Sequence, residues 1–245
     1  MITDVWTVMW KEWKELLVQR GSLRGGRLSL LILVGLLGVF LPWQTGRDWV
    51  ESPVVLVYSA YIPLFLVMSV IADSFAGERE RQTLETLLAS RLSDRAILFG
   101  KVGAAVGYGW GLTLISLLLG LVTVNLAHGR GELLLYPPAV GLGIVGFSLL
   151  GAGLVASAGV LVSLRASSVR QAQQTLSIAI MLLLFVPIFG GQALPAEWRA
   201  RLAQALVVAD VTKILLTVVA VLAVLDMALL AAAMIRFQRA RLILD

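Results

Sequence analysis

The chain of 245 residues is too apolar for a water-soluble domain, because 59% of its residues are hydrophobic and only 14% are charged. Soluble proteins average about 45–50% apolar and about 25% charged residues, and one core of this size could not bury the excess, so the composition predicts a membrane protein. The chain has no cysteine and one histidine, His128, which excludes disulfides, thiolate metal sites and paired-histidine metal motifs. Its 20 basic and 15 acidic residues give a net charge of +5, which in a membrane protein indicates basic cytoplasmic loops rather than nucleic-acid binding.

Residues 1–27 are expected to form a cytoplasmic segment at the membrane surface. Between residues 5 and 20, apolar side chains recur at helical spacing, and the charged residues, Glu12 among them, fall largely on the other side. This pattern predicts an amphipathic helix in the interface with its tryptophans among the lipid headgroups. Contact with a cytoplasmic partner is an alternative role for the same helix. No signal-peptide pattern precedes the first span, so we expect the segment to be retained.

Residues 28–245 are expected to form a domain of six membrane-spanning helices, since about 20 apolar residues are needed to cross the hydrocarbon. Pro187, Gly190 and Gly191 predict a break near the end of the fifth span, and residues 190–206 are expected to form an outer re-entrant or interfacial segment. The predicted spans are Leu28–Trp43, Val54–Ala72, Val102–Ala127, Ala139–Leu164, Leu176–Phe189 and Val211–Ile235.

The distribution of basic residues predicts the orientation of these spans. Of the 20 Lys and Arg residues, 15 fall on the side of the N-terminus, the C-terminus and the second and fourth loops, and 5 on the other side. The positive-inside rule therefore places both termini in the cytoplasm. Trp43, Trp49 and Trp198 are expected at the opposite interface, where indole rings prefer to lie.

Two features inside the spans are candidates for packing or transport. Glycines recur at short intervals in the third and fourth spans, for example at Gly103, Gly107 and Gly111, which favours close packing of helices in lipid. Asp226 lies deep in the last span, where a lone carboxylate is costly and is a candidate translocation site. A structural alternative is that Asp226 pairs with a hydroxyl group such as that of Thr217 or Ser157.

The loop between the second and third spans, residues 73–101, is a candidate partner site. Leu84, Leu87 and Leu88 form an apolar stripe on a segment that otherwise carries charges, and Arg81 and Glu85 are one helical turn apart. Ser93 can cap the helix of the third span. The pattern predicts a protruding helix whose leucines dock into a partner, with a merely solvated helix as the alternative.

The sequence contains no phosphate-binding loop, nucleophile elbow or zinc motif. The stretch Glu78–Lys101 resembles the signature of permease subunits of type-2 ATP-binding-cassette exporters, and Trp10–Leu17 resembles the elbow helix of the same family. Gln82 stands where that family usually has Gly, and Arg91 where it usually has Pro, which predicts a less sharply bent helix. The matching residues are Glu78, Glu80, Thr83, Leu84, Glu85, Leu87, Leu88, Ser90, Ser93, Arg95, Gly100 and Lys101.

The resemblance implies an all-α polytopic protein of the plasma membrane, from a prokaryote, that works as a dimer with a second copy or a close homologue. It implies a cytoplasmic ATPase on a separate chain, which would hold ATP and Mg²⁺, while this chain would carry no cofactor and no catalytic residue. Residues 73–101 would contain the coupling helix, and the loop around residues 165–174 a second contact. The residues expected to touch the ATPase are Glu78, Glu80, Arg81, Thr83, Leu84, Glu85, Leu87, Leu88, Arg165 and Arg170.

The leading hypothesis is therefore the permease subunit of an ATP-driven exporter with alternating access. The alternative is an ion- or proton-coupled secondary carrier that uses Asp226, although no inverted repeat supports it. Permeases of the resembled family export drugs, lipids, sodium, polysaccharides or peptides, and apolar spans alone do not choose among these substrates.

Overall fold

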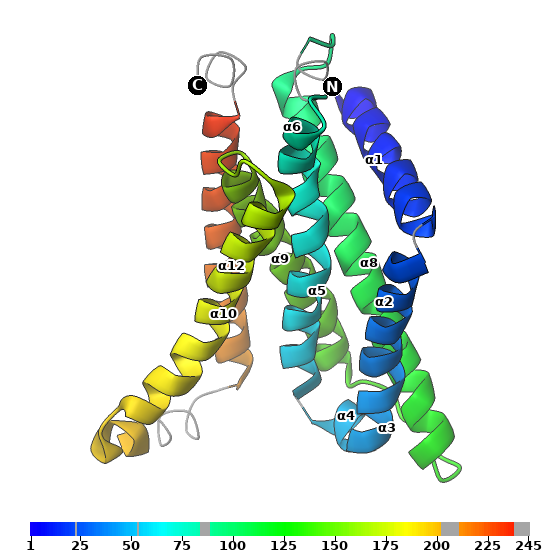
Figure 1. Cartoon of the computed structure of the whole chain (residues 1–245). Helices are drawn as coiled ribbons and strands as arrows, with labels where there is room; N and C mark the ends of the chain where they lie inside the picture. The colour runs from blue at the N-terminus through cyan, green and yellow to red at the C-terminus, as the bar shows by residue number, and fades with distance from the viewer. Residues whose placement is uncertain (23, 53, 84–88, 202–210, 238–245) are drawn as a thin grey trace.

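The computed structural model describes the chain except for residues 23, 53, 84–88, 202–210 and 238–245. The elements within the described residues are helices, and η1 and η2 are short π-helical turns inside longer helices (Figure 1). Their bounds are α1 Ile2–Ser22, α2 Arg24–Gly35, η1 Leu36–Phe40, α3 Leu41–Thr45, α4 Asp48–Glu51, α5 Val54–Ala72, η2 Asp73–Gly77, α6 Glu78–Glu80, α8 Asp94–His128, α9 Pro138–Ser163, α10 Val169–Ala193 and α12 Val211–Arg236.

Five helices in the described part of the chain are long and apolar enough to cross a membrane. They run over Val55–Glu80, Asp94–His128, Pro138–Ser163, Val169–Ala193 and Leu215–Arg236, which correspond to the second to sixth predicted spans. The first predicted span coincides with a shorter apolar helix, Leu30–Thr45, formed by α2, η1 and α3. The chain is therefore a polytopic membrane protein that is helical throughout its regular described elements, and the count of six spans stays a prediction.

The predicted break at Pro187 is wrong, because α10 continues through this residue to Ala193. A proline removes one backbone donor, but a helix in an apolar setting keeps its other internal hydrogen bonds, since unpaired backbone groups there are costly. The chain changes direction instead at Leu194 and Pro195, and helix resumes over residues 196–201. The rest of the segment predicted over residues 190–206 lies outside the described residues.

The centre of the bundle is formed by α5 packed against α9 and α8 (Figure 1). A side chain at Gly151 would collide with the carbonyl oxygen of Ala60, and one at Gly159 with Ile71, so these glycines let α9 approach α5 closely. The prediction that glycines serve internal packing is confirmed at these positions. Gly111 has open space around it and shows no such contact.

Helix α1 packs lengthwise along the beginning of α8, and both helices run in the same direction (Figure 1). Val8 contacts Gly100, and Trp13 lies against Gly107 and donates a hydrogen bond to the carbonyl oxygen of Ala104 at 3.1 Å. With 35 residues, α8 is about 50 Å long and exceeds the hydrocarbon thickness of about 30 Å, so its first turns can extend beyond the lipid together with α1. Trp6 and Trp10 remain exposed, as an interfacial helix would have them.

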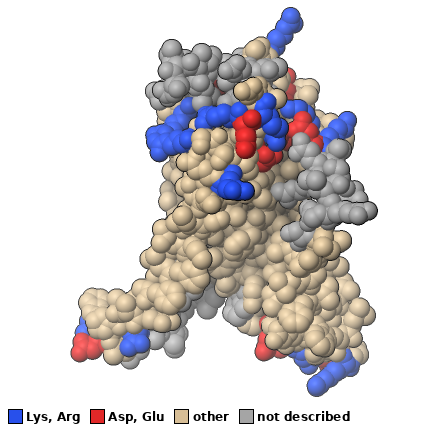
Figure 2. Space-filling model, in the orientation of Figure 1, with Lys and Arg blue, Asp and Glu red and all other residues tan. Residues whose placement is uncertain are grey.

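The bundle has two distinct ends. At the end that we name the basic end, α1, α8 and α10 begin and α6, α9 and α12 finish, and Lys and Arg side chains form a band across it (Figure 2). At the opposite end, which we name the aromatic end, Trp49 of α4 is 2% exposed and stacks on Tyr58 with ring centroids 5.0 Å apart. Trp49 is therefore a core residue rather than a surface anchor, whereas Trp43 and Trp198 are exposed.

Candidate coupling site at the basic end

A buried ionic cluster joins three separate segments at the basic end. The ammonium group of Lys101, on α8, donates hydrogen bonds to Glu12 of α1 at 2.7 Å, to Glu78 of α6 at 2.8 Å and to the carbonyl oxygen of Ser74 at 2.9 Å. Lys101 is 1% exposed, and both carboxylates are largely buried. A charge so far from water is tolerated only when opposite charges and hydrogen bonds surround it. The cluster therefore fixes α1 and the start of the 73–101 loop relative to α8.

The prediction that Glu12 falls on the side of its helix away from the apolar side chains is wrong, because Glu12 is buried. Glu12 lies one turn after Val8, which is also buried against α8, so the two residues share a face. The sequence patterns predicted ion pairs only between neighbours on one helix. Glu12 and Lys101 are 89 positions apart, so their pairing could not be predicted in this way.

The π-helical turn η2 directs the chain toward this cluster, and Ser163 at the end of α9 stabilises it. In a regular α-helix the N–H of Ala76 would bond to the carbonyl oxygen of Ala72. Here the Ser163 hydroxyl lies between them, accepting from the Ala76 N–H at 2.9 Å and donating to the Ala72 oxygen at 3.0 Å. A side chain inserted into the helical hydrogen-bond ladder is a recognised cause of such bulges, which are frequent at functional sites.

Helix α6 also bridges the ends of two further helices. Arg79 donates to the carbonyl oxygen of Leu164 at 2.8 Å and to that of Ala166 at 2.9 Å, just after α9 ends. Glu80 accepts from the N–H of Val169 at 3.3 Å, where α10 begins. Both contacts suit the helix dipoles, which favour a cation at a C-terminus and an anion at an N-terminus. The role of Arg79 was not predicted from the sequence, although a basic residue between the two motif glutamates was a visible signal.

The chain then turns away at Gln82. The N–H of Thr83 bonds to the carbonyl oxygen of Glu78 at 2.8 Å and that of Gln82 to Arg79 at 3.0 Å, which is the Schellman pattern of a helix end. Gln82 has φ of 57°, the left-handed conformation that favours glycine. Replacement of the family's glycine by Gln82 therefore does not remove the turn.

The residues predicted to touch an ATPase are distributed as follows. Glu80, Arg81 and Thr83 are exposed, whereas Glu78 is buried against Lys101. Arg81 forms an ion pair with Asp73 at 3.3 Å. Its predicted partner Glu85, together with Leu84, Leu87 and Leu88, lies outside the described residues, so their contact with an ATPase stays a prediction. Ser93 caps α8 as predicted, accepting from the N–H of Ala96 at 3.2 Å.

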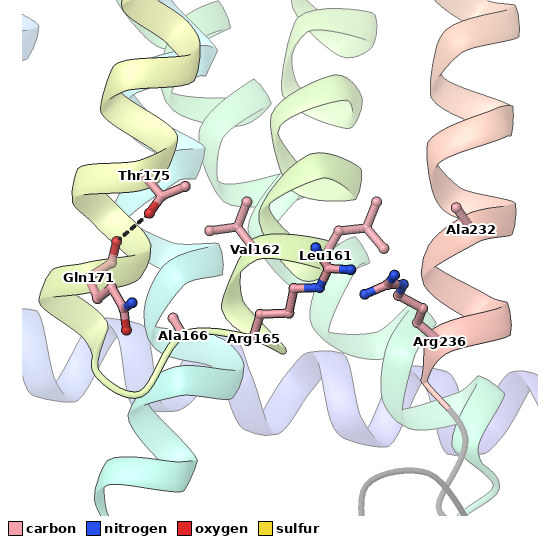
Figure 3. A pocket seen from close by; sticks show the side chains of 8 residues that line it. All are labelled: Leu161, Val162, Arg165, Ala166, Gln171, Thr175, Ala232 and Arg236. Carbon is pink, nitrogen blue, oxygen red and sulfur yellow. Dashed lines mark hydrogen bonds between the residues drawn. The ribbon is translucent and has the colours of Figure 1, made fainter. Parts of the chain in front are cut away.

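The second predicted contact, Arg165 and Arg170, lies beside this site on the connection between α9 and α10. Both side chains are exposed, and Arg165 lines a cavity of about 360 Å³ between α9, α10 and α12 (Figure 3). Because Arg79 and Glu80 hold this connection, the structure brings the two predicted contact segments together at the basic end.

Asp226 lies ten residues before the end of α12, on the face of this helix that packs against α9. Its carboxylate is directed at Gly153, where a side chain would collide with it, and is hydrogen-bonded to Ser157. Its Oδ1 is buried with no partner in the part of the chain that the structure describes. Of the two hydroxyl partners considered from sequence, Thr217 bonds instead to the carbonyl oxygen of Lys213.

The fold and this site define a polytopic membrane protein whose loops at the basic end are bonded to the ends of its spans. Residues 3–218 match the family of ABC-2 type transporters, which is most of the chain, and the chain belongs to this family. It is 27% identical over 164 residues to the ABC transporter permease protein NatB of Bacillus subtilis (strain 168), an alignment covering 60% of this chain and 40% of that protein. The chain thus matches less than half the length of this relative. It is a multi-pass protein of the plasma membrane, and the bacterial relative fits a prokaryotic source.

Proposed function

We propose that this chain is the membrane subunit of an ATP-driven exporter and that its basic end, on the cytoplasmic side, receives a separate ATPase. The observation that carries the proposal is the bridge from the 73–101 loop to three spans. Arg79 and Glu80 join it to the ends of α9 and α10, and Glu78 joins it through Lys101 to α8. Movement of a docked ATPase would therefore reach the spans through directional bonds, of which the one from Lys101 to Glu78 is buried, rather than through a loose loop.

The mechanism that follows is alternating access driven by the partner. ATP and Mg²⁺ would be held by the ATPase, and closure of that subunit would move the coupling segment after Gln82. The rigid connection through Arg79 would turn this motion into a shift of α9 and α10. The present chain would contribute positioning and a path but no hydrolysis.

A second copy of the chain, or a close homologue, would complete the path. Helices α10 and α12 expose many large apolar side chains, including Met181, Phe185 and Phe189 on α10 and Val221 on α12. Lipid covers such a surface in a monomer, and a second permease would cover part of it in a dimer, where close packing replaces lipid contacts.

The docking role of the coupling segment is tested by co-purification of the tagged permease with its ATPase. Leu84→Ser together with Leu88→Ser should release the ATPase, because apolar anchors in a partner groove carry most of the affinity. Leu133→Ser with Leu135→Ser is the matched control, since both leucines are exposed in the connection at the aromatic end. Full ATPase retention by the Leu84/Leu88 variant would refute docking at this segment.

Transmission is tested separately with Arg79→Gln. This variant loses the two bonds to the end of α9 but keeps the docking leucines, so the ATPase should remain bound while transport per ATP hydrolysed falls. Arg91→Gln removes an exposed charge of the same loop and serves as the control. If Arg79→Gln transports with normal coupling in proteoliposomes, the bridge does not transmit the motion.

The alternative of an ion-coupled carrier has one supporting observation, the buried and partly unpaired carboxylate of Asp226. Asp226→Asn keeps the shape of the side chain and removes its ionisation. The exporter proposal expects folding and assembly of this variant to stay intact and ATP-dependent transport to continue. Transport by the wild type in the absence of ATP, driven by an ion gradient and abolished in Asp226→Asn, would favour the carrier.

A further inference from the structure

A cavity of about 360 Å³ opens at the basic end between the end of α9, the first turns of α10 and the end of α12 (Figure 3). The side chains of Arg165 and Arg236 point toward each other across it. Neither guanidinium group has an acidic or hydrogen-bonding partner within the described residues. Two cations that face each other repel, and an anion bound between them would replace this repulsion by attraction.

The other walls of the cavity show what kind of anion fits. Gln171 receives hydrogen bonds on its Oε1 from Ser167, at 2.8 Å from the backbone and 2.9 Å from the hydroxyl, which leaves its amide N–H groups as further donors. Leu161, Val162 and Ala232 line the part that lies deeper along the spans. The cavity thus has hydrogen-bond donors at its opening and apolar side chains deeper along the spans. This arrangement matches a charged headgroup attached to an acyl chain.

The position along the spans supports the same ligand. Arg236 is the last residue of α12 and Arg165 comes two residues after the end of α9, so both lie where spans leave the hydrocarbon. Lipid phosphates lie at this level, and basic pockets between spans on the cytoplasmic side are typical sites for anionic headgroups. Arginine suits them because its planar fork donates two hydrogen bonds to one phosphate group.

We propose that Arg165 and Arg236 form a binding site for the phosphate group of an anionic phospholipid at the inner membrane surface. The assignment of the inner surface rests on the orientation in the proposed function, whereas the site itself does not. Because Arg165 belongs to the connection that Arg79 holds, a bound lipid would tie α12 to the same cytoplasmic connection and stabilise one spacing of α9 and α12.

The test uses the purified full chain in detergent without its ATPase, so that failure here is separable from failure of the coupling proposal. Native mass spectrometry would measure retention of phosphatidylglycerol against phosphatidylcholine with the same acyl chains. The wild type should prefer phosphatidylglycerol, and Arg165→Gln with Arg236→Gln should weaken that binding by about tenfold. Arg91→Gln with Arg170→Gln removes the same charge from exposed positions outside the cavity and should keep the preference.

Three results would overturn the proposal. An equal loss in the Arg91/Arg170 control would show attraction by overall charge instead of a site. Protection of the chain against thermal unfolding by inorganic phosphate, as strong as that by the lipid, would identify a soluble anion as the ligand. Unchanged lipid retention in the Arg165/Arg236 variant, combined with loss of the ATPase in co-purification, would assign the two arginines to the partner contact.

A variant that keeps both charges covers the case in which the glutamine pair does not fold. Arg165→Lys with Arg236→Lys retains attraction but loses the planar fork, so phosphatidylglycerol retention should fall severalfold. Equal retention by the lysine pair and the wild type would contradict recognition of the phosphate by arginine forks.

Discussion

The two ends of the central helices α5, α8 and α9 are held together by different physics. At the aromatic end, Trp49 fills a buried space, stacks on Tyr58 and donates to the Tyr136 hydroxyl at 3.1 Å, which in turn donates to the Leu117 carbonyl at 3.2 Å. Burial raises the pKa of Tyr136 to about 12, so its hydroxyl keeps the proton that it donates. At the basic end, Lys101, Arg79 and Ser163 make directional bonds to carboxylates and backbone.

This difference affects how each end can respond to a movement of its neighbours. Packing of a large ring contributes free energy through buried area and depends little on direction. A buried charge specifies its partners strictly, because losing one partner leaves the other charge unpaired in a poor solvent for ions. The aromatic end is suited to stay fixed, and the basic end to pass on a defined movement.

The largest expected effect is that of Lys101→Met. This change leaves Glu12 and Glu78 buried without a counter-charge and should destabilise the fold by about 3–5 kcal/mol. Thermal unfolding of the purified protein in detergent measures it, with Lys14→Met, at an exposed position of α1, as the control.

A rescue variant sharpens this result. Adding Glu12→Gln and Glu78→Gln to Lys101→Met removes the unpaired charges, so much of the lost stability should return. If Lys101→Met alone is as stable as the wild type, the cluster does not hold the basic end together.

Ser163→Ala is expected to cost about 1–3 kcal/mol, because it leaves the buried N–H of Ala76 and carbonyl of Ala72 without their shared partner. If η2 instead relaxes to a regular α-helix, the residues after it rotate, and Arg79 no longer meets the end of α9. Stimulated ATP hydrolysis should then lose its link to transport. A variant with unchanged stability and coupling would show that Ser163 is dispensable. Ser148→Ala is the comparison, because Ser148 is buried and, among the described residues, its hydroxyl bonds to its own helix.

At the aromatic end, Trp49→Phe should have a smaller effect of about 1–2 kcal/mol. The ring remains apolar and planar, while the hydrogen bond to Tyr136 is lost and a small cavity forms. The proposed function assigns transmission to the basic end, so the folded fraction of this variant should keep normal coupling between hydrolysis and transport. A coupling defect as large as that of Arg79→Gln would remove the distinction between the two ends.

The helices and some of their packing could be predicted from the sequence, because apolar length, glycine spacing and a serine cap are local signals. The sequence singled out residues 73–101 as a candidate partner site, but it did not predict the bonds that hold the beginning of this segment. Glu12 pairs with Lys101 and Ser163 inserts between Ala72 and Ala76 only because the fold brings distant segments together. The predicted break at Pro187 failed because the general rule for proline in helices was applied to a span. In lipid, the cost of unpaired backbone groups favours a continuous helix.

The smallest expected effect, and one of opposite sign, is that of Gln82→Gly. Gln82 holds φ of 57° in the turn that ends α6, and this conformation costs a side-chain-bearing residue about 1–2 kcal/mol. Glycine relieves this strain but adds about 0.5–1 kcal/mol of unfolded-state entropy, so the net gain should be about 0.5–1 kcal/mol. Gln174→Gly is the matched control, since Gln174 is exposed within α10 and the same substitution there should destabilise by about 0.5–1 kcal/mol. Thermal unfolding of both variants, measured side by side, shows whether glycine relieves strain at residue 82. If Gln82→Gly lowers stability as Gln174→Gly does, the left-handed turn is not the native end of this helix, and the geometry by which the coupling segment leaves the basic end must differ.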